Sequence, residues 1–266
     1  MRMSRTSPVK IIVIGAGGTG GYVIPHLYRL SYALRRDIRV IICDGDLVEE
    51  KNLIRQNFIA QDIGRNKAQV QAERYSAAFG IECEYIPRYV ESVENLASLV
   101  RPDFYKGNQH IETQDVILLG CVDNNNSRQI CHKVFGKQKD IVYIDSGNGE
   151  HTGQVVCGVR QKGKTVYKSV CTKYPDMRKK TDKLPSELSC AERSVSAPQS
   201  VTANLMAATA VVSFLYDLLV CGELKTESVT FSSKQINMRP EFEEPPKPKA
   251  KTKPKTKAVK TAKRKE

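Results

Sequence analysis

A glycine-rich turn near the start of the chain has the spacing of a phosphate-binding loop. Residues 15–20 read Gly-Ala-Gly-Gly-Thr-Gly, and the GxGxxG pattern follows an apolar run rich in β-branched residues, Val9–Ile14. Glycines let the backbone approach a phosphate closely, and the free N–H groups at the start of a helix favour negative charge. The turn therefore indicates nucleotide binding. The structural alternative is a tight turn that serves only helix–strand packing.

An acidic residue stands where the second strand of such a fold should end. Residues 39–43 form the next apolar run, and Asp44 follows it directly. An acid at this place holds ribose hydroxyls in dinucleotide-binding folds. Asp44 alone therefore fits an NAD-dependent oxidoreductase as well as an enzyme that uses ATP.

The polar residues after Asp44 favour the second possibility. A dinucleotide enzyme needs no Asn52, Arg55 or Gln56 after its second strand, yet all three follow here. Lys67 comes next, near the start of a predicted helix. Cations beside a phosphate loop suit phosphoryl chemistry, because charge accumulates on the phosphate oxygens as the leaving group departs.

Four motifs then occur in a recognisable order: GxGGxG, D-x-D-x-V-x-x-x-N-L-x-R-Q, D-x-G-x-x-K and D-N-x-x-x-R. Together they resemble the ThiF/MoeB/E1 superfamily of ubiquitin-activating-type adenylyltransferases, over residues 8–240 and most closely over residues 10–160. The Cys-Ala-Glu stretch before Pro-Gln-Ser and a long helix is similar to bacterial members of the plasmid-associated PRTRC kind. The resemblance implies ATP- and Mg²⁺-dependent adenylation of a carboxylate, most often the C-terminal glycine of a ubiquitin-like or sulfur-carrier-like protein.

Other functions stay open at this point. An enzyme of the same fold could adenylate a small molecule or an RNA-linked carboxylate. An NAD-dependent oxidoreductase would give Arg55, Lys67 and Asp123 no role, and a binding module with a dead nucleotide site would have lost a catalytic cation. The chain retains both candidate cations, Arg55 and Lys67.

The resemblance also implies roles for individual residues. Arg55 would clamp β- and γ-phosphate oxygens, Lys67 would bridge phosphates near the reacting centre, and Asp123 would hold Mg²⁺, a cation that prefers oxygen ligands. The implied nucleotide-binding set is Gly15, Gly17, Gly18, Gly20, Asp44, Asn52, Arg55, Gln56 and Lys67.

Each of these residues also has a structural interpretation. Arg55 could be a surface arginine in a loop, Lys67 a solvated helix residue, and Asp123 an N-cap for the following helix. Arg128 fits a structural salt bridge better than a contact with ATP. Asp46 could be either a turn residue or a residue that supports the nucleotide-binding ones.

Many relatives transfer the acyl group to a cysteine. Cys190 lies in the long loop before the last predicted helix and is our first candidate for that thiol. Cys171 is the second, because Lys168 and Lys173 nearby in sequence would lower its pKa. A third possibility is that no thioester forms. The chain has no CxxC pair, so we expect no zinc site.

Strands and helices alternate along the chain, and this predicts an α/β fold with a Rossmann-like, doubly wound, mainly parallel sheet. A predicted hairpin, residues 154–159 and 165–169, adds an antiparallel edge. The other predicted strands are residues 9–14, 39–43, 81–89, 115–119, 141–144 and 228–232. The predicted helices are residues 21–36, 64–79, 92–100, 124–135 and 199–220. The longest apolar run, residues 205–221, is too short to span a bilayer comfortably, and we expect a buried helix there.

We expect an adenylation domain over residues 1–244 and a disordered tail over residues 245–266. The net charge is +13, of which the tail carries +9, leaving +4 for the rest. The tail is therefore either a tether to nucleic acid or an acidic partner, or a dispensable solvated extension. Reduced cysteines and the lack of a signal peptide favour a cytoplasmic protein without membrane contact. The resemblance implies a homodimer.

Overall fold

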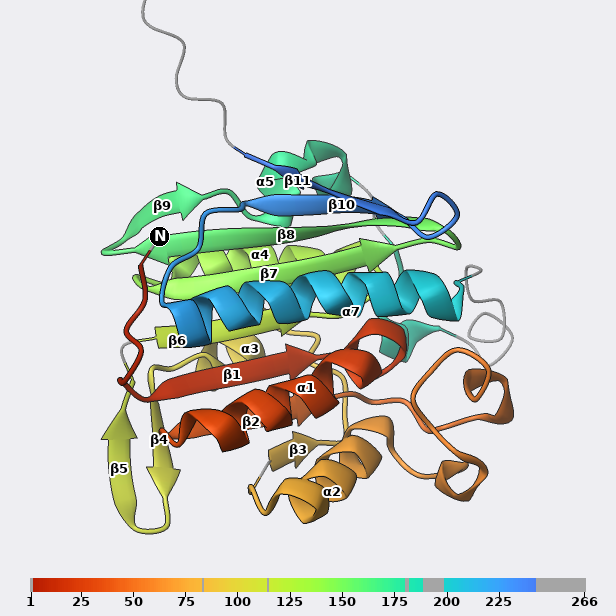
Figure 1. Ribbon diagram of the computed structural model, residues 1–266, viewed down its shortest axis with the longest axis horizontal. Helices are drawn as coiled ribbons and strands as arrows, with labels where there is room; N and C mark the ends of the chain where they lie inside the picture. Colours follow the sequence, from red (N-terminus) through yellow and green to blue (C-terminus); the bar gives the residue numbers. More distant parts are fainter. Residues whose placement is uncertain (1, 83, 114, 180–181, 189–198, 243–266) are drawn as a thin grey trace, which may run out of the picture.

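One large mixed sheet forms the centre of the computed structural model, which describes residues 2–242 except residues 83, 114, 180–181 and 189–198 (Figure 1). Within these residues the sheet has nine strands, in the order β11-β10-β8-β7-β6-β1-β2-β3, with β9 beside β8. Their bounds are β1 Val9–Ile14, β2 Ile38–Cys43, β3 Glu84–Ile86, β6 Asp115–Gly120, β7 Ile141–Asn148, β8 Thr152–Gln161, β9 Lys164–Tyr167, β10 Ser228–Ser232 and β11 Asn237–Glu241.

The strands divide into a parallel half and an antiparallel edge. The strands β3, β2, β1, β6 and β7 are mutually parallel, and β1 runs in register between β2 and β6. From β7 onward the pairs β7–β8, β8–β9, β8–β10 and β10–β11 are antiparallel. The prediction of a doubly wound, mainly parallel sheet with an antiparallel edge is confirmed.

Helices cover both faces of the sheet. The bounds are α1 Gly18–Leu34, α2 Lys67–Phe79, α3 Val93–Leu99, α4 Asn125–Lys137, α5 Val170–Lys173 and α7 Val201–Tyr216. In Figure 1, α1 and α7 lie in front of the sheet, whereas α3 and α4 lie behind it. Alternate residues of β1 supply the two cores: Ile11 and Val13 pack with α1 and α7, and Ile12 and Ile14 pack with α3 and α4.

The buried helix predicted near the C-terminal end corresponds to α7 and the π-helical turn after it, Asp217–Cys221. By length and composition alone, the stretch Val201–Cys221 is apolar enough to cross a membrane. Half of its most apolar window is nevertheless buried inside the protein. This burial is what a core helix of a doubly wound sheet requires, because α7 covers β7 and β8.

Several elements differ from the prediction. Of the residues described between 81 and 89, only Glu84–Ile86 form a strand, β3, which lies at the edge of the sheet beside β2. A separate hairpin, β4 Asp103–Lys106 and β5 Gln109–Glu112, was not predicted, and neither was β11. These strands are mostly exposed, so they lack the apolar patterning that reveals a strand in sequence. Cys190, the boundary at residues 244–245 and the basic tail lie outside the described residues.

Candidate functional site

The glycine turn lies at the carboxyl edge of the parallel strands, between β1 and α1, beside the loop that follows β2 (Figure 1). Gly15 has a φ of +95°, and a Cβ there would meet the carbonyl oxygen of Cys121 at 2.4 Å. A Cβ at Gly20 would meet the carbonyl oxygen of Gly15 at 2.0 Å. Both positions therefore accept only glycine. Gly17 is the N-cap of α1 and brings no side chain of its own, so the helix N-terminus is left accessible to an anion.

Asp44 ties this turn to the end of β2. Its Oδ2 accepts a hydrogen bond from the Ala16 N–H at 2.7 Å, and its Oδ1 accepts one from the Asp46 N–H at 2.8 Å. Burial raises the pKa of Asp44, and the charge of Lys67 opposes that shift. Asp44 thus shapes the loop itself, and each oxygen keeps a lone pair that a ribose hydroxyl could use.

Lys67 is the first residue of α2 and is buried, with its ammonium 3.0 Å from Asp46 Oδ2. Asn66 is the N-cap of this helix, and its Nδ2 donates to the backbone oxygens of Asp44 and Asp46. The interpretation of Lys67 as a solvated helix residue is therefore wrong. The ammonium is held at the carboxyl end of β2, close to Asp44.

The loop after β2 brings Asn52 and Gln56 to the site in different ways. Asn52 is buried and its Oδ1 accepts the Glu49 N–H at 2.9 Å, so its side chain closes the turn. Gln56 packs over the glycine turn: a Cβ added to Gly17 would lie 3.5 Å from its amide. Its Oε1 is buried and has no hydrogen-bond partner among the described residues. A buried, unpartnered amide oxygen beside a phosphate loop fits a site that a ligand completes.

Arg55 is half-buried, and its guanidinium donates to Gln199 Oε1 at 2.9 Å. Asn204 Nδ2 donates to the Arg55 carbonyl at 3.1 Å, and the same amide would meet a Cβ at Gly18 at 2.7 Å. Arg55 is therefore anchored next to the glycine turn, and the interpretation as a surface arginine in an unrelated loop is wrong.

Sequence reasoning missed four residues of this region. Asn204 is fully buried on α7, and Asn148 at the end of β7 donates to its Oδ1 at 3.0 Å. Thr19 donates to Asn148 Oδ1 at 3.3 Å, which links the start of α1 to the network. Gln199, which accepts from Arg55, is the fourth. An asparagine inside the apolar run of α7 was the available signal, because a buried amide needs partners.

Asp123 and Arg128 lie at the same edge, after β6. Asp123 is exposed, and Asn124 rather than Asp123 is the N-cap of α4, since its Oδ1 accepts the Ser127 N–H at 2.8 Å. The N-cap interpretation of Asp123 is wrong. Arg128 is buried against Asp145, with 3.1 Å between Nε and Oδ1, and the predicted structural salt bridge is confirmed.

The second candidate thiol is not activated. Cys171 is buried, and burial raises its pKa to about 11. The prediction that Lys168 and Lys173 lower this pKa is wrong, because burial of the thiol dominates and neither lysine contributes to the shift. The Lys173 ammonium instead lies 2.9 Å from the carboxylate of Glu241 on β11. Cys190 lies outside the described residues.

The residues present fit a nucleotide with one metal ion. The glycine backbone and the cations Lys67 and Arg55 suit phosphates, whereas the unpartnered Gln56 oxygen can only accept a hydrogen bond from a donor on the ligand. Within the described part of the chain, the Asp123 carboxylate has no hydrogen bond or ion pair. One carboxylate together with phosphates is a usual way to hold Mg²⁺. No group of three His, Cys, Asp or Glu suited to a metal occurs in the described part of the chain.

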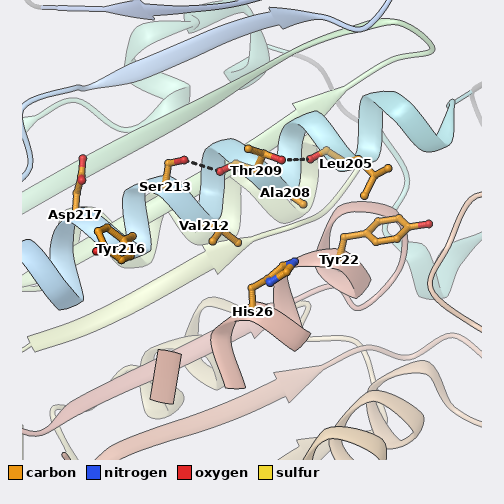
Figure 2. A pocket seen from close by; sticks show the side chains of 9 residues that line it. All are labelled: Tyr22, His26, Leu205, Ala208, Thr209, Val212, Ser213, Tyr216 and Asp217. Carbon is orange, nitrogen blue, oxygen red and sulfur yellow. Dashed lines mark hydrogen bonds between the residues drawn. The ribbon is translucent and has the colours of Figure 1, made fainter. Parts of the chain in front are cut away.

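A groove of about 460 Å³ lies elsewhere, between α1 and α7, as Figure 2 shows. His26 and Tyr22 of α1 face Leu205, Val212 and other residues of α7 across it. None of the predicted site residues lines this groove, so the candidate site is the glycine turn.

Comparison with known proteins identifies the family. The sequence profile of the ThiF family matches residues 2–256. The chain belongs to the ThiF family. The resemblance based on the four motifs is therefore confirmed.

Individual relatives of this ThiF-family chain agree with that assignment. It is 39% identical over 103 residues to the NEDD8-activating enzyme E1 catalytic subunit of Saccharomyces cerevisiae, a match that covers 38% of this chain and 31% of the yeast protein. Its fold is similar to that of PaaA, with a TM-score of 0.61, 18% identity and coverage of 90% of this chain and 65% of PaaA. For the structure of E. coli MccB with ATP, the TM-score is 0.59 and the identity 17%, and the match covers 90% of this chain and 64% of MccB. The chain thus spans under a third of the yeast relative and just under two thirds of the two structures.

Proposed function

We propose that this chain adenylates a carboxylate with ATP and releases pyrophosphate. The observation that carries the proposal is one juxtaposition: the glycine turn, the buried Lys67 ammonium and the anchored Arg55 lie together at the carboxyl edge of β1 and β2. Asp123 follows the adjacent strand β6. Bound ATP would supply the electrophilic α-phosphate and the pyrophosphate leaving group.

The chain's own residues would then provide positioning and charge. Lys67 and Arg55 would neutralise phosphate oxygens, Gln56 would donate its amide N–H groups, and Asp123 would hold Mg²⁺. The turn at Gly17 and Gly18 would let the backbone approach the phosphates. Asp44 would accept from the ribose while keeping the turn in place.

For the substrate we propose the C-terminal glycine of a ubiquitin-like or sulfur-carrier-like small protein. Support comes from the relatives: one is a NEDD8-activating enzyme subunit, and MccB has been solved with N-formylated MccA as well as with ATP. A small-molecule or RNA-linked carboxylate is the second candidate. Family membership favours both of these over an NAD-dependent oxidoreductase.

Further parts of the proposal concern the whole protein. We propose a cytoplasmic homodimer, with residues 1–244 as the adenylation domain and residues 245–266 as a separate basic tail. If an acyl thioester forms, Cys190 is the proposed thiol, and trapping the thioester in wild type but not in Cys190→Ser would support it.

ATP–pyrophosphate exchange with candidate carboxylates tests the central proposal. Lys67→Ala and Asp123→Ala should each abolish most of the exchange, because one removes a phosphate cation and the other the magnesium ligand. Lys106→Ala is the matched control, since this lysine pairs with Asp37 at the opposite end of β2. Exchange that persists in both site variants would show that the residues are misassigned.

A further inference from the structure

Asp46 connects the Lys67 ammonium to a tyrosine that no sequence motif singled out. Its Oδ2 lies 3.0 Å from Lys67 Nζ, and its Oδ1 accepts a hydrogen bond from the Tyr89 hydroxyl. Tyr89 comes shortly after β3, so the contact joins the ends of two neighbouring strands. The carboxylate thus has a different donor at each oxygen.

The ring of Tyr89 lies against the backbone of Gly45. A Cβ at Gly45 would lie 2.7 Å from two carbons of that ring. The glycine between Asp44 and Asp46 therefore provides the space that the tyrosine needs to reach Asp46.

The carboxylate of Asp46 is not needed to close the loop. The backbone oxygen of Asp46 already accepts the Lys67 N–H at 3.0 Å and the Asn66 Nδ2 at 3.1 Å. The side chain of Asp46 is 41% exposed, whereas that of Lys67 is 8% exposed. The Asp46 side chain is therefore partly open to solvent, while its carboxylate contacts the buried Lys67 ammonium.

We propose that Asp46 and Tyr89 are positioning residues that hold the Lys67 ammonium in one orientation at the nucleotide site. A lysine side chain loses rotamer entropy when it is ordered, so an ammonium that is already fixed meets a developing phosphate charge at a smaller entropic cost. Tyr89 acts through Asp46, because its hydroxyl fixes the carboxylate that binds the lysine. The role in turnover depends on the proposed adenylation function.

Kinetics of ATP–pyrophosphate exchange separate positioning from binding. For Asp46→Asn we expect kcat to fall by about 10- to 100-fold and KM for ATP to change less than about threefold, as for an interaction used mainly in the transition state. For Tyr89→Phe we expect a fall in kcat of about 3- to 10-fold. The double variant should resemble Asp46→Asn alone, because the hydroxyl acts through the carboxylate.

Two matched controls come from the same strands. Asp37→Asn breaks an Asp–Lys pair at the other end of β2, and Tyr85→Phe removes the hydroxyl of an exposed tyrosine on β3. Both should keep wild-type kcat. Equal effects in site and control variants, additive effects in the double variant, or a change confined to KM would overturn the proposal.

Labelling of Lys67 in the nucleotide-free protein tests the same positioning without turnover. An amine-reactive ester, followed by peptide mass spectrometry, should modify Lys67 several-fold faster in Asp46→Asn than in wild type or Asp37→Asn. An unchanged rate would overturn the positioning role even if exchange is active. If wild type shows no exchange with any carboxylate, the proposed function fails, while the labelling still decides whether Asp46 holds Lys67.

Discussion

Two cation–carboxylate pairs lie at the carboxyl edge of the sheet, and they differ in burial. In the pair Arg128–Asp145 the side chains are 7% and 0% exposed, whereas in the pair Lys67–Asp46 they are 8% and 41% exposed. Arg128 also donates to the carbonyls of Val122 and Ser146, at 2.6 and 3.2 Å.

The carboxylate of the first pair is enclosed as well. Tyr143 donates to Asp145 Oδ2 at 2.6 Å, so both oxygens of Asp145 have partners inside the core. A pair of this kind cannot exchange a partner for a ligand without leaving a buried charge uncompensated. In the pair Lys67–Asp46 a ligand can approach without uncovering a buried charge, because water reaches Asp46 and the ammonium has N–H donors besides the one that Asp46 accepts. Burial of the carboxylate partner therefore separates a pair that supports the fold from one whose cation can meet a phosphate.

The largest effect should follow from breaking the enclosed pair. Arg128→Ala leaves Asp145 buried without its counter-charge, and we expect the free energy of unfolding to fall by about 3–5 kcal/mol. Urea denaturation measures this loss. As a control, Arg128→Met combined with Asp145→Leu should recover part of it, because no charge is left buried. A single variant within about 1 kcal/mol of wild type would contradict the comparison.

Next comes the open pair. Lys67→Ala should lower ATP–pyrophosphate exchange by about 10²- to 10³-fold, the scale for losing one preorganised charge donor, and should change the free energy of unfolding by about 1 kcal/mol or less. Asp46 stays hydrated when the lysine is removed. Lys106→Ala should change neither quantity. A loss of stability as large as that of Arg128→Ala would show that both pairs support the fold.

Thiol reactivity compares the accessibility of the enclosed region with that of the surface. Cys171 lies beside Arg128, with Sγ 3.7 Å from its carbonyl oxygen, and a pKa of about 11 leaves on the order of one thiolate in a thousand at pH 8. Iodoacetamide should therefore modify the exposed Cys221 at least about tenfold faster than Cys171, as read by mass spectrometry. Urea should remove the difference. Equal rates in the folded protein would mean that this region opens readily.

The smallest effect concerns the loop between β2 and α2. Asn52→Ala removes the acceptor for the Glu49 N–H, and we expect a loss of about 1 kcal/mol in stability with less than about a tenfold loss of exchange. Asn95→Ala on α3 is a comparison variant at an exposed asparagine. A loss of exchange as large as that of Lys67→Ala would instead indicate that Asn52 contacts the nucleotide.

Much of the fold could be predicted from local pattern. The runs that became β1, β2, β6 and β7 are apolar and rich in β-branched residues, because parallel strands are buried on both faces. The exposed hairpin β4–β5 and the edge strand β11 lack that pattern and were missed.

The site could be predicted only in part, for a similar reason. Gly15, Asp44, Arg55 and Lys67 stand in motifs whose spacing is local. Asn204 lies far along the chain from the glycine turn that it contacts, and no local spacing reports such a pairing.

The sequence by itself determined the order of strands and helices, the glycine-rich sharp turn after β1, and the residue types of a phosphate site. These follow from short-range sterics and from apolar periodicity, which act between neighbours along the chain. Only the tertiary structure decided which cation–carboxylate pair is enclosed and which is open, that Asn52 closes a turn, that Cys171 is buried, and that Tyr89 reaches Asp46. Burial and long-range contacts depend on how the elements pack against one another, and that packing is a property of the folded chain.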